Sequence, residues 1–121
     1  MRIYDTSYLV DAITRGEDLT GAILDLTLYE ITNVVKKAIE RKDISENEGE
    51  TLLKYLATLD LEVIRVQTDD LPKILTIAKK YNLTAYDAAY VYFATKKQAE
   101  LMTLDRKLDK AYQKVKKKGY L

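Results

Sequence analysis

Short strand-like segments alternate with amphipathic helices along the chain, and this order constrains the fold more than any other feature of the sequence. Runs of branched and apolar residues predict strands at residues 2–5, 22–26, 62–66 and 101–104. Helical spacing and capping residues predict helices at about 7–13, 27–42, 45–59, 69–82 and 84–97 and from 105 onward. Because strands that alternate with helices build parallel sheets covered on both faces, we expect an α/β fold, a three-layer α/β/α sandwich around a short, mainly parallel sheet.

The length of the chain fits one such unit. With 121 residues it can bury one core, and we expect residues 1–121 to form a single domain. No apolar run approaches the roughly 20 residues that span a bilayer, so we expect no membrane association. A carboxylate at Asp5 precedes any apolar stretch, which is unlike a signal peptide. The expected location is the cytoplasm.

Histidine and cysteine are both absent from the sequence. These residues are the preferred ligands of zinc, and a Ser-His-Asp triad or a Cys-His pair cannot be built without them. Disulfide bonds are excluded as well. Any catalysis must therefore use carboxylates, hydroxyls, lysines, tyrosines or a hard metal ion.

Four carboxylates are candidates for such a metal site. Asp5 and Asp105 each end a predicted strand and begin a helix, which places both at the carboxyl edge of the sheet. We expect Glu30 and Asp87 in the first turns of two helices, so all four side chains can reach one edge. Mg²⁺ and Mn²⁺ prefer carboxylate oxygen and water, and such an ion can activate water for attack on a phosphate.

Each of these four residues also has a purely structural interpretation. Asp5 and Asp105 are good helix N-caps, while Glu30 and Asp87 each stand three residues after a threonine, as in a capping box. Taken singly, capping accounts for every one of them. It does not explain why two strands both end in aspartate, so the site and the capping interpretations both stay open.

Residues near the acids have less definite assignments. Asn33 lies one helical turn after the glutamate and is placed to support a ligand. Asp109 lies one turn after the last aspartate, as a supporting acid or an ordinary surface charge. Tyr86, Tyr90 and Phe93 fit one face of a helix, and core packing is the default interpretation of that face.

Charge is distributed unevenly between the two halves of the chain. Residues 1–60 carry 7 basic and 12 acidic side chains, a net charge of −5, whereas residues 61–121 carry 13 and 7, a net charge of +6. Much of the positive charge lies in the last predicted helix, including Lys110, Lys114 and Lys117. These lysines either contact a phosphate backbone or form the solvated face of a terminal helix.

Four sequence motifs, in order along nearly the whole chain, resemble the acidic motifs of PIN domains. They are DTSYLV from residue 5, LTLYEITN from residue 26, LTAYDAAY from residue 83 and LMTLD from residue 101. Their order and the chain length are similar to those of the VapC-type toxin ribonucleases of VapBC toxin–antitoxin systems.

This resemblance implies a PIN-like fold and an Mg²⁺- or Mn²⁺-dependent endoribonuclease that hydrolyses RNA with a metal-activated water. It implies an acidic quartet as catalytic and metal-binding residues, formed by Asp5, Glu30, Asp87 and Asp105. Thr6, Asn33 and Thr103 would support the quartet, with Asp109 a less regular addition. It also implies a homodimer, and as partner a VapB-type antitoxin whose C-terminal segment covers the groove.

Three other functions are alternatives to a metal-dependent ribonuclease. A haloacid-dehalogenase-like phosphatase needs a D-x-D motif, but Ser7 fills the second acidic position. A receiver domain needs an aspartate after its middle strand, where Val66, Gln67 and Thr68 stand instead. A catalytically silent PIN-like domain that serves binding or scaffolding is the remaining alternative. The four clustered carboxylates argue against a silent domain, because a site that no longer catalyses a reaction does not need clustered like charges.

Overall fold

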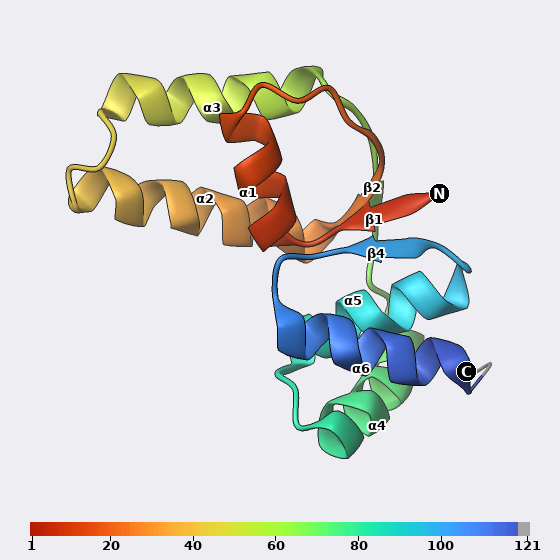
Figure 1. The fold of residues 1–121 in the computed structure, drawn as a ribbon. Coiled ribbons are helices and arrows are strands. Elements are labelled where there is room, and N and C mark those ends of the chain that lie inside the picture. Colours follow the sequence, from red (N-terminus) through yellow and green to blue (C-terminus); the bar gives the residue numbers. More distant parts are fainter. Residues whose placement is uncertain (119–121) are drawn as a thin grey trace.

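The computed structural model describes residues 1–118 and contains four strands and six α-helices (Figure 1). The strands are β1 (Arg2–Tyr4), β2 (Thr20–Leu24), β3 (Asp60–Ile64) and β4 (Glu100–Met102). The helices are α1 (Thr6–Thr14), α2 (Asp25–Glu40), α3 (Glu46–Thr58), α4 (Leu71–Tyr81), α5 (Ala85–Lys96) and α6 (Arg106–Lys117). A short 3-10 helix, η1 (Thr68–Asp70), precedes α4.

The strands form one parallel sheet in the order β3-β2-β1-β4. Parallel neighbours require crossover connections, which the helices supply. Figure 1 shows α1, α2 and α3 on one face of the sheet and α4, α5 and α6 on the other, while the α2–α3 hairpin extends past the sheet. The expected three-layer α/β/α fold is therefore confirmed.

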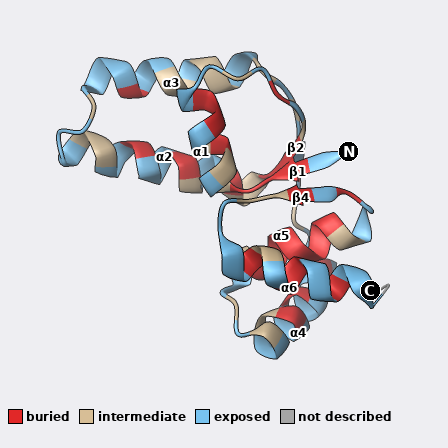
Figure 2. Cartoon of the chain, in the orientation of Figure 1, coloured by how far each residue is buried: buried red, intermediate tan, exposed pale blue. Residues whose placement is uncertain are grey.

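Two clusters of buried side chains fill the spaces between these layers. One joins the sheet to α4, α5 and α6, and nearly all of α5 from Ala88 to Ala94 is buried in it. The other joins the sheet to α1, α2 and α3 through residues such as Leu9, Ile23 and Ile31. Figure 2 shows these buried positions on α1 and α5. Among residues 1–118, no helix is both long and apolar enough to span a membrane.

All four predicted strands end earlier than expected, by one residue in β1 and by two in the others, and one side chain accounts for the ends of β2 and β3. The strand predicted at 22–26 stops at Leu24, because Asp25 begins α2 and its Oδ1 accepts a hydrogen bond from the Leu26 amide. The strand predicted at 62–66 stops at Ile64. The Val66 amide, two residues later, donates to Asp25 Oδ2 at 3.1 Å instead of to a strand. Both strands also begin two residues before the expected positions.

Helix ends were predicted more accurately than strand ends. Ser45 caps α3 through the expected capping box with Glu48, and Asn82 ends α4 in the left-handed conformation with φ 53°. The exception is α2, which begins at Asp25 rather than at Thr27. This shift of two residues changes the position of Glu30 within its helix.

Candidate active site

Parallel pairing of β1 with β4 brings two of the predicted acids to one edge. The register aligns Tyr4 with Met102, and the Asp5 amide extends it by donating to the Met102 carbonyl at 3.1 Å. Thr103 then links the two aspartates, because its hydroxyl donates to Asp5 Oδ2 and accepts from the Asp105 amide at 3.0 Å. The predicted strand 101–104 stops at Met102, where this side-chain contact replaces strand pairing.

Asp5 is buried at the start of α1, with 5% of its surface exposed. Its Oδ1 accepts hydrogen bonds from the Tyr8 amide at 2.9 Å and from the Ser7 hydroxyl at 2.7 Å. Ser7 in turn accepts from the Leu104 amide at 3.1 Å, which ties α1 to the segment after β4. Asp5 is thus an N-cap and a member of the acidic edge at once. Ser7 belongs to the DTSYLV motif, but the sequence pattern predicts no role for it at this edge.

Glu30 lies in the second turn of α2, so the prediction that it stands in a first turn is wrong. The capping-box interpretation of this residue is wrong as well, because the Thr27 hydroxyl accepts from the Leu24 amide and Leu24 is the N-cap. Glu30 Oε1 instead accepts from the hydroxyls of Thr6 at 2.7 Å and Tyr90 at 2.8 Å. Both donors use Oε1, so Oε2 takes no part in these two hydrogen bonds.

Tyr90 is a site residue that the sequence interpretation assigned to packing. Its ring is buried in the core, yet its hydroxyl lies between Thr27 Oγ1 at 2.7 Å and Glu30 Oε1 at 2.8 Å. Thr6 Oγ1 is 3.2 Å from the same hydroxyl. Burial raises the pKa of Tyr90 far above its ordinary value, so the phenol stays neutral and can donate to Glu30. The only sequence signal for a role of Tyr90 at the site was its place in the LTAYDAAY motif, one turn after Asp87.

Asp87 lies in the first turn of α5, after the N-cap Thr84, whose hydroxyl accepts from the Asp87 amide at 3.1 Å. The Asp87 carboxylate itself is half-buried. Burial raises its pKa, and the charges of three other carboxylates raise it further, namely Asp105, Glu30 and Asp5. The electrostatics of this one group therefore links all four predicted acids to the same edge of the sheet.

Asp105 combines capping with a place at this edge. It is the N-cap of α6, and its Oδ1 accepts from the amides of Lys107 at 2.9 Å and Leu108 at 3.2 Å. Neither amide uses Oδ2, and the residue is exposed. The capping interpretation and the site interpretation of Asp105 are therefore compatible.

The donor set at this edge suits a divalent cation that prefers oxygen ligands. It consists of carboxylates and hydroxyls, and hydrogen bonds orient one oxygen of Glu30 and of Asp105 while a second oxygen stays outside those contacts. Among residues 1–118, no three acidic side chains are grouped closely enough, as they stand, to hold a metal ion. Like charges repel one another when no cation lies between them, so binding requires these side chains to close in.

The remaining predicted residues lie at different distances from this edge. Thr6 and Thr103 contact the acids directly. Asn33 is exposed on α2, and Asp109 accepts a 3.4 Å hydrogen bond from Gln113 within α6. The three lysines proposed to contact RNA are exposed along α6, with Lys110 near its middle. At 1.5 Å per residue, Lys117 lies roughly 18 Å along the helix from Asp105.

The raised pKa of Asp87 generates a prediction about stability. A folded-state pKa above the unfolded value of 3.8 means that Asp87 contributes stability below pH 3.8 and loses it as pH rises through the folded value. In metal-free buffer at pH 7, Asp87→Asn should therefore raise the melting temperature by about 1–3 °C, because a partly exposed charge contributes less than about 1 kcal/mol. Thermal melts at pH 7 and near pH 3 measure this gain, which should vanish at the lower pH.

Asp18→Asn is the matched control, since Asp18 is exposed and lies outside the acidic edge. It should give no gain at either pH. A lower melting temperature of Asp87→Asn at pH 7 would show that charge crowding does not govern Asp87.

Comparison with known proteins agrees with this geometry. The PIN domain family model matches residues 3–114. Ribonuclease VapC3 of Pyrobaculum aerophilum is 33% identical over 99 residues, which are 80% of this chain and 73% of that protein. The crystal structure of PAE2754 from Pyrobaculum aerophilum matches with a TM-score of 0.75 at 30% identity, covering 91% of this chain and 78% of that one. A toxin–antitoxin complex from Klebsiella pneumoniae shares the fold, with a TM-score of 0.60 at 19% identity over 87% of each chain. The chain belongs to the PIN-domain family, as a VapC-type member.

Proposed function

We propose that this chain is a divalent-metal-dependent endoribonuclease, the toxin of a VapBC-type toxin–antitoxin pair. One observation carries the proposal. Four segments that are distant in sequence each contribute a carboxylate to one edge of the sheet, and three of these carboxylates raise the pKa of the fourth, Asp87. A structural role gives no reason to gather four like charges, whereas metal-assisted phosphodiester hydrolysis requires them. The ribonuclease name of the VapC3 relative supports the same reaction class.

The side chains have distinct roles in this proposal. Asp5, Glu30, Asp87 and Asp105 would hold Mg²⁺ or Mn²⁺. The bound ion would polarise the scissile phosphate and lower the pKa of the attacking water. Hydroxyl donors keep two of these carboxylates oriented, through Ser7 and Thr103 at Asp5 and through Thr6 and Tyr90 at Glu30. Hydrolysis would add the hydroxyl of water to phosphorus, break the P–O ester bond opposite it, and pass the water's proton to the leaving oxygen.

Cleavage assays test the metal and the acids together. The purified chain should cleave single-stranded RNA with Mg²⁺ or Mn²⁺ and stop in excess EDTA. Asp5→Asn and Asp87→Asn should each lose more than about 100-fold in rate, beyond the 10–100-fold typical of groups that only orient a metal ligand. Asp87→Asn should also shrink the rise in melting temperature that Mn²⁺ gives the wild type, because a ligand that binds only the folded state stabilises it.

Asp18→Asn serves again as the control and should cleave at the wild-type rate. Undiminished cleavage in excess EDTA would contradict the metal mechanism. Mn²⁺ binding without any cleavage would support the silent-domain alternative instead.

The exposed lysines of α6 offer a path for RNA away from the acidic edge. If Lys110, Lys114 and Lys117 contact phosphates, replacing all three with Gln should weaken RNA binding. The log–log slope of affinity against salt should flatten by up to about 0.7 per lost contact on a single strand. A matched variant with Lys37, Lys42 and Lys54 changed to Gln removes the same charge from the α2–α3 hairpin. Equal slopes in the wild type and the α6 variant would leave these lysines as a solvated face.

Two partners belong to this proposal, namely a second copy of the chain and a VapB-type antitoxin encoded beside it. The VapC-type relationship supports both, and exposed apolar side chains are available for contact, with 81% of Tyr29 and 41% of Leu28 accessible. The Tyr55 hydroxyl, by contrast, is engaged within the chain, because it donates to the Gly16 and Glu17 carbonyls.

Light scattering at micromolar concentration should give twice the mass of one chain. Co-expression with the neighbouring small protein should give a complex that no longer cleaves RNA. A strictly monomeric chain would contradict the dimer, and a complex that keeps full activity would contradict the antitoxin role.

A further inference from the structure

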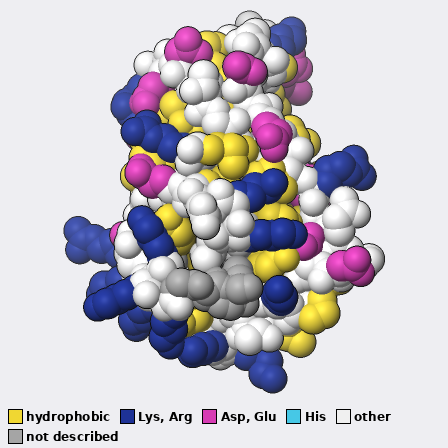
Figure 3. Space-filling view, turned by 90° about the vertical axis from the view of Figure 1, so that its right-hand side faces the viewer, with side chains coloured by type: hydrophobic (Ala, Val, Ile, Leu, Met, Phe, Trp, Pro, Cys, Tyr) yellow, Lys and Arg dark blue, Asp and Glu magenta, His cyan; other side chains and the backbone are white. Residues whose placement is uncertain are grey.

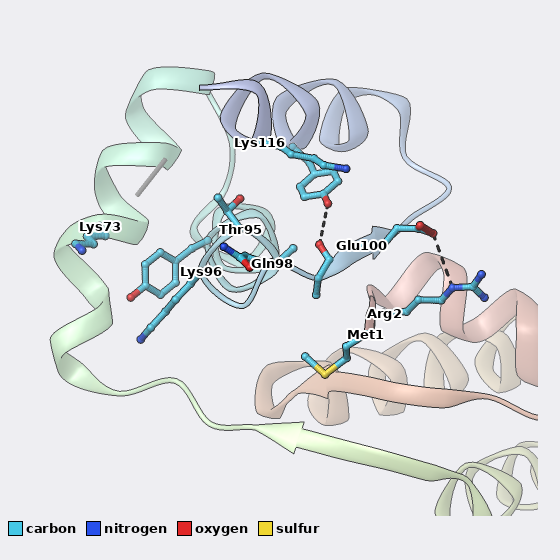
Figure 4. Close-up of a pocket in the computed structure, with 12 residues that line it drawn as sticks. Met1, Arg2, Lys73, Thr95, Lys96, Gln98, Glu100 and Lys116 are labelled. Carbon is cyan, nitrogen blue, oxygen red and sulfur yellow. Dashed lines mark hydrogen bonds and ion pairs between the residues drawn. The ribbon is translucent and has the colours of Figure 1, made fainter. Parts of the chain in front are cut away.

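A second charged site lies at the amino edge of the sheet, opposite the acidic carboxylates. There a cavity of about 780 Å³ opens between the start of β1, the start of α4 and the ends of α5 and α6 (Figure 4). This volume is within the usual range of small-ligand pockets. Its charged lining residues are Arg2, Lys73, Lys96, Lys116 and Glu100, four cations to one anion.

The course of the helices separates this cavity from the acidic edge. Helix α5 carries Asp87 in its first turn and Lys96 in its last, and α6 runs from Asp105 to the turn that holds Lys116. At 1.5 Å per residue the two edges are roughly 15 Å apart. Figure 3, which faces the amino edge, shows Lys and Arg side chains gathered over the part of the molecule formed by α4, α5 and α6.

Two of the four cations have structural partners. Arg2 pairs with Glu100 at 3.8 Å across β1 and β4, and Lys96 Nζ lies 3.3 Å from Asp70 Oδ1. Lys96 also lies 5.5 Å above the ring of Tyr92 in the cavity wall. Fold stability alone can therefore account for both residues.

Lys73 and Lys116 differ from Arg2 and Lys96 in their ion pairing. Among residues 1–118, no acidic side chain forms an ion pair with either of them. Lys73 stands in the first turn of α4, where the helix dipole disfavours a positive charge. Lys116 Nζ lies 5.7 Å above the ring of Tyr112, which holds the ammonium group against the cavity wall. Two cations without an ion-pair partner among residues 1–118 thus line a cavity that Arg2 and Lys96 also line.

The walls also indicate which part of a ligand would be recognised. The rings of Tyr92 and Tyr112 are 4% and 2% exposed, and their hydroxyls are used by Asp70 and the Ala99 carbonyl. They offer no open face for a base to stack on. A cavity lined by cations from four elements suits a compact anion with several charged oxygens.

We propose that this amino-edge cavity is a binding site for an oligophosphate group, as carried by inorganic polyphosphates and nucleoside triphosphates. The site is separate from the nuclease centre and does not depend on its activity. Lys73 and Lys116, which have no ion-pair partner in the part of the chain that the structure describes, supply positive charge, while Arg2 and Lys96 extend the contact.

Calorimetric titration of the full chain with tripolyphosphate and, separately, with ATP tests this site. Excess EDTA keeps divalent ions from bridging phosphates to the acidic edge, and about 0.15 M salt screens non-specific attraction. Both ligands should bind saturably at one site per chain. Equal affinities would mean that phosphate alone is recognised, and tighter ATP binding would mean that the nucleoside contributes, each in agreement with the proposal.

Lys73→Gln/Lys116→Gln should weaken tripolyphosphate binding by about tenfold or more, equivalent to about 1.4 kcal/mol. Lys73→Arg/Lys116→Arg should restore most of it, whereas the control Lys37→Gln/Lys54→Gln, which removes the same charge from the α2–α3 hairpin, should bind like the wild type. Absence of saturable binding would overturn the proposal, and so would equal weakening by the control. Loss of RNA affinity in the Gln variant without any tripolyphosphate binding would also overturn it, because the lysines would then follow a polynucleotide.

Discussion

The parallel pairing of β1 with β4 is the constraint on which the rest of the acidic edge depends. Both strands are only three residues long, and their register places Tyr4 beside Met102. Each strand therefore ends at the same level, and Asp5 meets Thr103 directly after it. A slip of one residue would turn the side chains of β4 to the opposite faces and remove Thr103 from Asp5. The placement of these groups is thus a property of strand register before it is a property of any side chain.

Neutral hydrogen-bond donors make a cluster of carboxylates tolerable at this edge. Serine, threonine and tyrosine hydroxyls donate to Asp5 and Glu30, so charge is stabilised without a basic residue that would compete with a metal ion. The helix N-termini that begin here add a favourable dipole for negative charge. Capping and metal binding are therefore not alternatives at Asp5 and Asp105, since the geometry that satisfies the helix also aims the carboxylate at the edge.

The sequence predicted the layers, the order of elements and the edge at which the acids lie, because strand-end aspartates and capping patterns are local signals. It failed where a contact joins distant segments. The hydrogen-bond partners of Glu30 are Thr6 and Tyr90, which are 24 and 60 residues away from it in sequence. Tyr90 reads as a packing residue because its ring is buried, and only the structure reveals its hydroxyl partners. The amino-edge cavity has no local pattern at all, since its cations come from residues 2 to 116.

The parallel topology also explains why opposite charges collect at opposite edges. Helices α1, α2, α5 and α6 start at the carboxyl edge, and α5 and α6 end at the amino edge. Acids in first turns and lysines in last turns both complement the helix dipole, so such polarity arises in part without any ligand. Lys73 departs from this rule, because it places a cation in a first turn at the amino edge. The helix dipole therefore does not account for Lys73, whereas the cavity that it lines offers a reason for its position.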